Sequence, residues 1–465
     1  MKVLLYRTPV QIETNHPRHI YPPLHLVHLR NLMLRNRIRA CLVDGWLRDI
    51  PKDFLPGKDE PLLIVAEMDQ PASVSALEKL ARIRNRGGQV FVILIGALPT
   101  WRSGEFLLPG SPIDLIITGD VSLGSSEVIL EAAGGCDRWN SIRAAFPDRL
   151  CRPEDNSHSG SHIPVLGYLP ERRRDYTFIY PVPLSRSLVT GYIRTSSGCP
   201  RKCVFCSQPI RKSYGDRYRT ASLESVFGEI EEMKRGGMNF LSIEDDNFSV
   251  DSSRLEEFCR GLLDRRLNLF WTAQVRADDL SPSLIDLMHR SGCRFLQFGL
   301  ESGNSSSLLS LGKTNDPSGF KESAVRAFMR ARRNGIAACA LLMLGIPGES
   351  ERDFFETMKW IGGLKPDLIE FHFFTPYPGS LFHEALSEHE KKRLKTLYHH
   401  DFPRANYSGM RSGSLYKIRS LLYRRFYVSP AFLVRSSRYV YFYLKNPEVL
   451  IYLLRKCLPL FMSPL

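Results

Sequence analysis

The sequence predicts an α/β protein in which a doubly wound parallel sheet is followed by a partial (β/α)6 barrel and a basic helical region. Two stretches of the 465-residue chain alternate short, continuous apolar runs with helix-like segments. Such runs are typical of parallel strands that intervening helices bury on both faces. Between the two stretches the periodicity is lost, and after residue 390 basic and aromatic residues interleave. A chain of this length is expected to form two or three domains.

The first domain is expected to span residues 1–136. Its strands are predicted at 3–6, 40–44, 62–66, 89–95 and 114–118, with helices at 24–36 and 73–86. Loops that begin with glycine follow the last two strands, at 96–100 and 119–123. Ligands of open α/β sheets bind at such carboxyl-end loops, so Gly96, Thr100 and Gly119 are candidate binding residues.

Residues 137–187 are rich in Pro, Ser, Arg and Asp and are expected to form a linker. From 188 to 390 the alternation restarts. Six strands are predicted at 189–194, 240–244, 270–275, 295–300, 337–344 and 368–374, with helices near 222–235, 252–265, 281–291, 317–334 and 350–362. Six such units make an incomplete barrel, whose chemistry is expected at the carboxyl ends of its strands.

Three cysteines follow the first barrel strand closely, in the pattern C-x3-C-x2-C formed by Cys199, Cys203 and Cys206, with Phe205 before the last. Three thiolates this close can converge on a metal or bind three irons of a cubic iron–sulfur cluster, which needs four ligands. A zinc site is the alternative, but it usually has a second CxxC pair or added His ligands, and no second pair is present.

Further polar sets follow the later barrel strands, each with a structural alternative. The acids Glu244, Asp245 and Asp246 suit a cationic ligand group or a solvated turn that caps the next helix. The other candidates are Gln274 with Arg276 (a carboxylate contact or a surface salt bridge), Glu301 with Ser302 (hydroxyl contacts or an N-cap cluster), and Gly345 with Gly348 (close backbone approach or a plain turn).

The cysteine spacing with Phe205 resembles the radical S-adenosylmethionine (SAM) superfamily. The resemblance implies a [4Fe–4S] cluster on Cys199, Cys203 and Cys206, with the amino and carboxylate groups of SAM at the fourth iron. One-electron reduction of SAM would then release a 5′-deoxyadenosyl radical that abstracts hydrogen from an unactivated C–H bond. In this superfamily acids after the second strand hold the SAM ammonium, Glu301 and Ser302 suit its ribose or carboxylate, Gln274 and Arg276 its carboxylate, and Gly345 and Gly348 its adenine.

The order of the sheet domain, the cysteines, Asp245-Asp-Asn-Phe248, Gly299-Leu-Glu-Ser-Gly303 and Gly345-Ile-Pro-Gly-Glu349 is similar to radical SAM enzymes with an N-terminal, Rossmann-like cobalamin-binding domain. The resemblance implies cobalamin-dependent methylation of an unactivated carbon in a secondary metabolite or lipid. Residues 96–100 and 119–123 depart from that family's cofactor loops. A cobalamin-independent dehydration, epimerisation or cyclisation, for example of an aminoglycoside-type sugar, therefore stays open, as does a non-catalytic cluster protein.

The net charge of +14 is concentrated after residue 390, where 15 basic residues stand against two acids. This region, 391–465, is interpreted as a helical cap, with an anionic membrane surface and nucleic acid as alternatives. No nucleic-acid module accompanies it, so nucleic acid is not an expected partner. The seven cysteines outside the motif are scattered and no secretory signal is evident, which favours a cytoplasmic protein, peripheral at the inner membrane face if the tail binds lipid. An electron donor such as flavodoxin or ferredoxin is implied.

Overall fold

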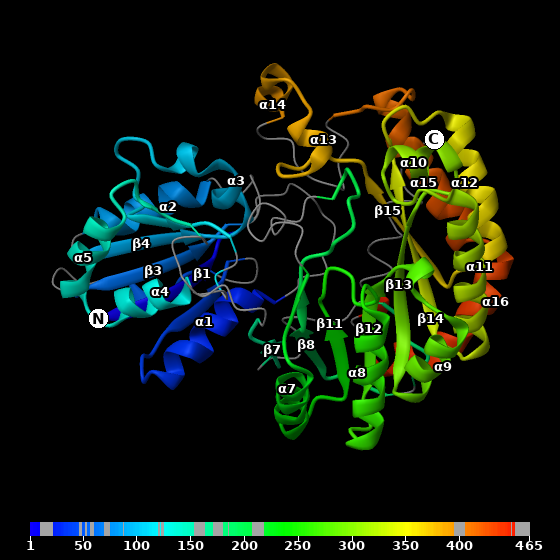
Figure 1. Cartoon of the computed structure of the whole chain (residues 1–465), viewed down its shortest axis with the longest axis horizontal. Helices are drawn as coiled ribbons and strands as arrows, with labels where there is room; N and C mark the ends of the chain where they lie inside the picture. The colour runs from blue at the N-terminus through cyan, green and yellow to red at the C-terminus, as the bar shows by residue number, and fades with distance from the viewer. Residues whose placement is uncertain are drawn as a thin grey trace.

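The computed structural model divides the chain into an N-terminal sheet domain and a larger barrel domain (Figure 1). It describes residues 1–9, 22–45, 49–51, 54–55, 60–68, 75–86, 88–119, 121, 125–152, 163–170, 180–184, 186–206, 218–394, 405–447 and 449–451. Within these residues no helix is both long and apolar enough to cross a membrane. The predicted fold class is confirmed.

The first sheet is parallel throughout and has the strand order β2-β1-β3-β4-β5-β6. Its strands are β1 (Lys2–Arg7), β2 (Cys41–Asp44), β3 (Leu62–Glu67), β4 (Val90–Ile95), β5 (Leu115–Ile117) and β6 (Leu150–Cys151). Its helices are α1 (Leu24–Arg35), α2 (Ser75–Arg84), α3 (Ala97–Phe106), α4 (Ser126–Ala133) and α5 (Trp139–Ala145). Alternate strand residues are buried against α1, α4 and α5 on one face and against α2 and α3 on the other (Figure 1).

The second sheet has the order β15-β14-β13-β12-β11-β8-β7, and only β7 is antiparallel. Its strands are β7 (Leu166–Tyr168), β8 (Thr190–Arg194), β11 (Phe240–Ile243), β12 (Phe270–Val275), β13 (Cys293–Glu301), β14 (Ala337–Leu344) and β15 (Leu368–Phe373). The short pair β9 (Ser196–Ser197) and β10 (Arg219–Thr220) flanks the cysteine segment. All six predicted barrel strands are present.

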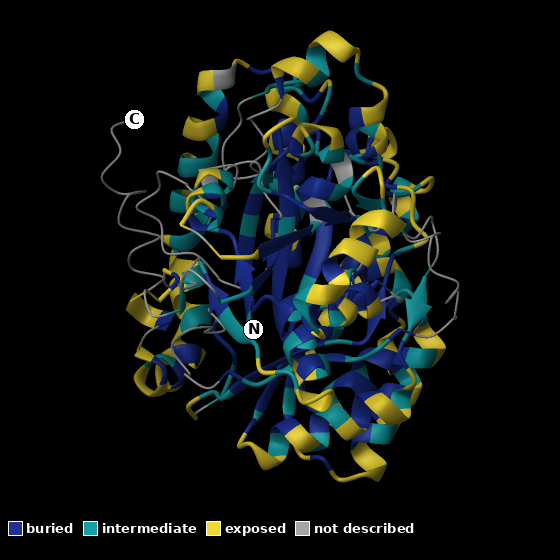
Figure 2. Ribbon diagram, turned by 90° about the vertical axis from the view of Figure 1, so that its left-hand side faces the viewer, coloured by how far each residue is buried: buried dark blue, intermediate teal, exposed yellow. Residues whose placement is uncertain are grey.

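The barrel helices lie on the outside of this sheet and give it a buried core with exposed outer faces (Figure 2). They are α7 (Leu223–Arg235), α8 (Ser252–Asp264), α9 (Pro282–Arg290), α10 (Ser305–Ser310), α11 (Pro317–Arg333) and α12 (Glu351–Leu364). Most begin at a Ser or Asp whose side chain accepts a backbone N–H of the first turn: Ser222, Asp251, Ser281, Asp316 and Ser350. Such N-caps fix where each helix starts.

The linker prediction for 137–187 differs from the structure. α5 and β6 belong to the first sheet domain, because β6 pairs with β5 and Trp139 packs on Phe91 with ring centroids 5.3 Å apart. β7 instead joins the second sheet, where it pairs with β8 and contacts α1. The first domain therefore extends to residue 151.

The described residues after 390 are mainly helical, as predicted. α14 (Glu388–Arg393) follows α13 (Leu381–Glu384), and the tail forms α15 (Ser412–Tyr427), α16 (Pro430–Ser436), a 3-10 turn η6 (Ser437–Tyr439) and α17 (Val440–Lys445). Tyr423 and Tyr427 of α15 bind the open edge of the barrel: their hydroxyls accept the backbone N–H of Phe371 (2.9 Å) and Ile369 (3.1 Å). An edge strand left unpaired is a site of unwanted association, so α15 acts as the cap that the sequence indicated.

Candidate active site

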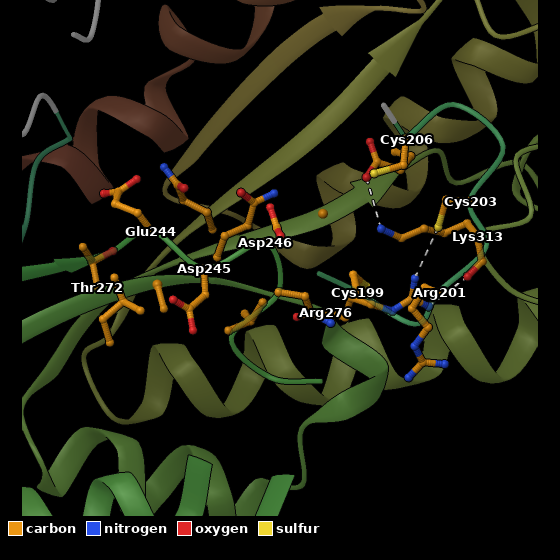
Figure 3. Close-up of a pocket in the computed structure, with 18 of the residues that line it drawn as sticks. Cys199, Arg201, Cys203, Cys206, Glu244, Asp245, Asp246, Thr272, Arg276 and Lys313 are labelled. Carbon is orange, nitrogen blue, oxygen red and sulfur yellow. Dashed lines mark hydrogen bonds and ion pairs between the residues drawn. The ribbon is translucent and has the colours of Figure 1, made fainter. Parts of the chain in front are cut away.

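A cavity of about 400 Å³ lies at the carboxyl ends of β11, β12 and β13, next to the cysteines (Figure 3). Its lining comes from the cysteine segment, the strand ends and the segment after α10: Cys199, Arg201, Cys203, Phe205, Cys206, Ser242, Ile243, Glu244, Asp245, Asp246, Asn247, Thr272, Ala273, Gln274, Val275, Arg276, Gln297, Gly299, Glu301 and Lys313. The cavity therefore lies at the strand rim that the sequence indicated.

Backbone hydrogen bonds join the cysteine segment to the residue after α10 and to α13. The Val204 N–H donates to the Leu311 carbonyl (2.9 Å), and the Phe382 N–H donates to the Val204 carbonyl (2.9 Å). All three cysteines line the cavity, and Cys203 is buried. In the described part of the chain no three Cys, His, Asp or Glu side chains converge to hold a single metal ion. Thiolates that each bind a different iron of one cluster need no such single point, so three cysteines on one cavity wall fit a cluster.

Two acids of the predicted triplet support the start of this segment. Asp245 is buried and accepts hydrogen bonds from the Thr195 N–H (2.6 Å), the Thr195 hydroxyl (2.7 Å) and the Ser196 hydroxyl (2.6 Å). Burial raises the pKa of its carboxyl, and these donors oppose that rise. Asp246 accepts from the N–H of Gly198, the residue before Cys199, at 2.9 Å. These two acids position the cysteines.

Glu244 differs from its two neighbours. Its side chain turns back along β11, where the Ser242 hydroxyl donates to it at 2.5 Å, and it lies at the far end of the cavity from Cys203 and Cys206 (Figure 3). Burial raises its pKa to about 7. Among the described residues no Lys, Arg or His forms an ion pair with it. A carboxylate that borders a cavity without a cationic partner is a typical ligand-binding group.

Arg276, predicted to contact a ligand carboxylate, is buried at the cysteine end. Its guanidinium donates to Asp278 (2.7 Å) and to the Lys313 carbonyl (2.8 Å), and it lies 4.0 Å from the Cys203 sulfur. This contact places a fixed positive charge beside the Cys203 sulfur. Gln274 also lines the cavity and is exposed to it.

The side chains of Glu301 and Ser302 lie in different places. Glu301 lines the cavity and accepts a hydrogen bond from the Lys313 ammonium at 3.1 Å, with both side chains nearly buried. Its backbone φ of 64° is unusual for a residue with a Cβ and adds local strain, which often occurs at functional sites. Ser302 is buried outside the cavity, 3.1 Å from the Thr357 hydroxyl.

Gly345 and Gly348, predicted near adenine, are not among the residues that line the cavity. The Gly345 N–H donates to the Glu349 carboxylate (3.0 Å), and the Gly348 N–H donates to the Tyr407 carbonyl (3.0 Å). Burial raises the pKa of Glu349 to about 8. In this structure the turn packs against the chain before α15.

The N-terminal candidates lie together at the carboxyl edge of the first sheet. The prediction of a loop at 96–100 is wrong, because Gly96 (φ 109°) directly precedes α3. Thr100 joins the candidates: its hydroxyl donates to the Gly96 carbonyl (2.7 Å) and accepts the Gly119 N–H (2.9 Å). The prediction for 120 and 122–123 lies outside the described residues.

A chain of polar contacts links this sheet edge to the cysteine segment. Glu67, at the end of β3, lies 3.1 Å from His25 Nδ1, and His25 Nε2 lies 3.2 Å from the Arg194 guanidinium. Arg194 in turn lies 3.7 Å from Asp246, which holds the Gly198 N–H. The second carboxylate oxygen of Glu67 is buried and has no hydrogen-bond partner among the described residues. The two domains therefore share one polar network.

Several lining residues were not singled out from the sequence: Arg201, Ser242, Thr272, Gln297 and Lys313. Ser242, Thr272 and Gln297 precede Glu244, Gln274 and Gly299 by two positions, and the alternation of strand side chains places such residues on one face. That signal was available in the sequence. Lys313 follows a short helix and carries no comparable signal.

The comparisons agree with this geometry. Residues 193–361 match the model of the radical SAM superfamily. An uncharacterised methyltransferase of Pyrococcus horikoshii is 25% identical over 370 residues, covering 77% of each chain. An anaerobic magnesium-protoporphyrin IX monomethyl ester cyclase of Rubrivivax gelatinosus is 27% identical over 433 residues, covering 89% of this chain and 75% of the cyclase.

Two solved structures share the whole arrangement. TsrM from Kitasatospora setae, a radical SAM methyltransferase with cobalamin and a [4Fe–4S] cluster bound, superposes with a TM-score of 0.58 at 17% identity, covering 82% of this chain and 74% of TsrM. The apo form of OxsB, a cobalamin-dependent SAM radical enzyme, gives a TM-score of 0.60 at 13% identity, covering 100% of this chain and 73% of OxsB. At these identities the likeness shows the fold.

Proposed function

We propose that this chain, whose central domain belongs to the radical SAM superfamily, is an enzyme that methylates an unactivated carbon of a secondary metabolite or lipid with cobalamin as methyl carrier. The observation that carries the proposal is the single cavity that brings Cys199, Cys203 and Cys206 together with unlike polar groups from three strands. A [4Fe–4S] cluster on these cysteines, with SAM bound, would supply a one-electron reduction that releases a 5′-deoxyadenosyl radical. A small molecule or a lipid is the substrate class, and flavodoxin or ferredoxin the class of electron donor.

The residues near the cysteines suit the charges of SAM. Asp246, held beside Cys199 through the Gly198 N–H, would face its ammonium, and Lys313 its carboxylate. Glu301 and Gln274 offer acceptors for hydroxyl groups. Glu244, at the other end of the cavity, would accept a hydrogen bond or a positive charge from the substrate.

The barrel end opposite the cavity is closed, which protects radical chemistry from water. Phe240 and Phe295, near the amino ends of β11 and β13, are buried with Val182 and with Tyr439 and Phe442 of the tail. Tyr180 stacks on Phe295 with centroids 5.1 Å apart. Access to the cavity is therefore from the carboxyl side of the sheet, where the first domain contributes His25 through Arg194.

The first domain offers residues that fit cobalamin. In a sheet with the order 2-1-3-4, ligands bind at the carboxyl ends of the first and third strands, where Glu67 has a buried acceptor oxygen without a partner. Gly96 and Gly119 have φ values of 109° and 86°, and they lie side by side through Thr100. Two glycines without a Cβ at one sheet edge permit a flat ring to approach the backbone.

A cobalamin-independent radical reaction is the second candidate. The departure of residues 96–100 and 119–123 from the cofactor loops of the cobalamin-binding enzymes supports it. The similarity to an ester cyclase supports cyclisation as an alternative to methylation. In that case the first domain would serve as a cover for the barrel.

Anaerobic reconstitution of the full chain, with and without hydroxocobalamin, separates the two candidates. The proposal expects stoichiometric retention of cobalamin, seen in the visible spectrum after desalting. Formation of 5′-deoxyadenosine from SAM without any retained cobalamin would reject methylation and favour the second candidate. Failure of the reduced protein to cleave SAM at all would leave a non-catalytic cluster protein.

A further inference from the structure

The tail segment from α16 to α17 has apolar side chains on both of its faces. Its backbone is helical from α16 through η6 into α17, apart from a distortion at Tyr439. On the inner face Tyr439 and Phe442 are buried against the barrel, and Phe432 and Tyr443 pack beside them. The inner face alone accounts for the attachment of the segment.

The outer face carries a second set of apolar side chains, which we name the outer stripe: Leu433, Val434, Val440, Tyr441 and Leu444. Val434, Tyr441 and Leu444 are 74%, 70% and 70% exposed. Positions 433, 437, 440 and 444 follow the helical repeat and share one side of the segment, with the polar Ser437 between Leu433 and Val440. An exposed apolar surface of this kind typically marks an interaction surface.

The charge around the outer stripe is mainly positive. Residues 405–451 contain eight Lys and Arg residues and one acid, Glu448. Arg425 and Lys445 are exposed near the two ends of the stripe. Arg438, within it, is paired with Asp367 at 2.7 Å. The surface therefore combines apolar contact area with net positive charge.

We propose that the outer stripe and the basic residues around it bind the surface of an anionic lipid bilayer. Apolar side chains enter the boundary between headgroups and acyl chains, while Lys and Arg meet the phosphates. A second copy of this chain is a poorer partner, because it would bring two surfaces of the same net positive charge together. Nucleic acid is poorer as well, because Leu and Val give no stacking surface and Tyr441 is the one aromatic side chain of the stripe.

The position of the stripe is compatible with catalysis at a membrane. The inner face of the same segment packs on Phe240, Phe295 and Leu368, which lie near the amino ends of their strands. The cavity lies at the carboxyl ends. Docking through the stripe would therefore leave the mouth of the cavity open to substrate, electron donor and the first domain. This inference does not depend on which reaction the cavity performs.

Co-sedimentation of the full chain with vesicles tests the proposal. Vesicles of phosphatidylcholine with about one third phosphatidylglycerol should bind the protein, vesicles of phosphatidylcholine alone should bind it at least about tenfold more weakly, and added salt should weaken the binding. The double substitution Val434→Gln with Leu444→Gln should weaken binding about tenfold. Arg425→Gln with Lys445→Gln should have a similar effect on anionic vesicles only.

Two exposed leucines outside the tail provide the matched control. Leu108→Gln with Leu309→Gln removes the same kind of side chain, at 61% and 52% exposure, and should leave vesicle binding unchanged. All variants should retain the circular dichroism spectrum of the wild type. Equal binding to both vesicle types, or equal loss in the control variant, would overturn the proposal. So would a wild-type dimer in gel filtration that the stripe variant dissociates, since the surface would then bind a second copy.

Discussion

The ion pair of Lys313 and Glu301 permits a sharp test of the site, because its structural role and its ligand role have different signatures. The two side chains are 6% and 14% exposed and meet at 3.1 Å. Lys313→Met would leave the Glu301 carboxylate buried without its cation, at a cost of about 3 kcal/mol in folding free energy. Glu301→Gln with Lys313→Met should recover most of that loss, since neither charge remains.

Binding of SAM should not recover in the same way. If the Lys313 ammonium meets the SAM carboxylate, its loss removes a charge-assisted hydrogen bond worth about 2 kcal/mol, or about 30-fold in Kd. Both Lys313→Met and the double variant should show this loss in anaerobic equilibrium dialysis of the reconstituted protein. Urea unfolding of the same variants gives the stability term, and Lys321→Met, on the outer surface of α11, is the control.

A wild-type Kd for SAM in the double variant would refute the ligand role of Lys313. A wild-type urea midpoint in Lys313→Met would refute the buried pair. The two results are independent of each other. The variants therefore distinguish a wrong assignment of the SAM-binding residue from a wrong assignment of the buried ion pair.

Three further predictions follow from named contacts. Burial raises the pKa of Glu244 to about 7, above the roughly 4.3 of an exposed Glu. The native state therefore binds this proton more tightly than the unfolded state does, and the free energy of unfolding should fall as pH rises from about 4 to 7. Glu244→Gln should remove this fall, and an unchanged pH dependence of the urea midpoint in the variant would contradict the prediction. Tyr423→Phe and Tyr427→Phe should each cost about 1–3 kcal/mol, because a backbone N–H at the barrel edge loses its acceptor; faster amide exchange of β15 is the readout. His25→Ala should loosen Arg194 and shift the electron paramagnetic resonance signal of the reduced cluster, whereas His289→Ala on α9 should not.

The barrel could be predicted from the sequence because its signals are local. Each strand is a continuous apolar run, and each helix begins at an N-cap residue such as Ser222 or Asp251. Some elements of the first domain were harder to predict from the sequence. α3 contains Pro99 and Gly104, which weaken helix propensity, and the burial of Leu98 and Phe106 against the sheet determines its structure.

The sequence predicted which residues gather at the site, but not which role each of them has. The sequence indicated three acids after β11, yet nothing local distinguishes Asp245, which anchors Thr195 and Ser196, from Glu244, which borders the cavity. That difference depends on which side chains other strands bring within hydrogen-bonding distance. The pairing of Lys313 with Glu301 likewise depends on tertiary structure, since only the fold brings these two residues together.

Reductive cleavage of SAM by the anaerobically reconstituted full chain is the decisive test of radical chemistry in this cavity. The reduced protein should form 5′-deoxyadenosine, and Cys203→Ala should abolish both this product and the visible absorbance of the cluster. Retention of a full cluster spectrum by Cys203→Ala, or a wild-type protein that holds its cluster but leaves SAM intact, would contradict this prediction.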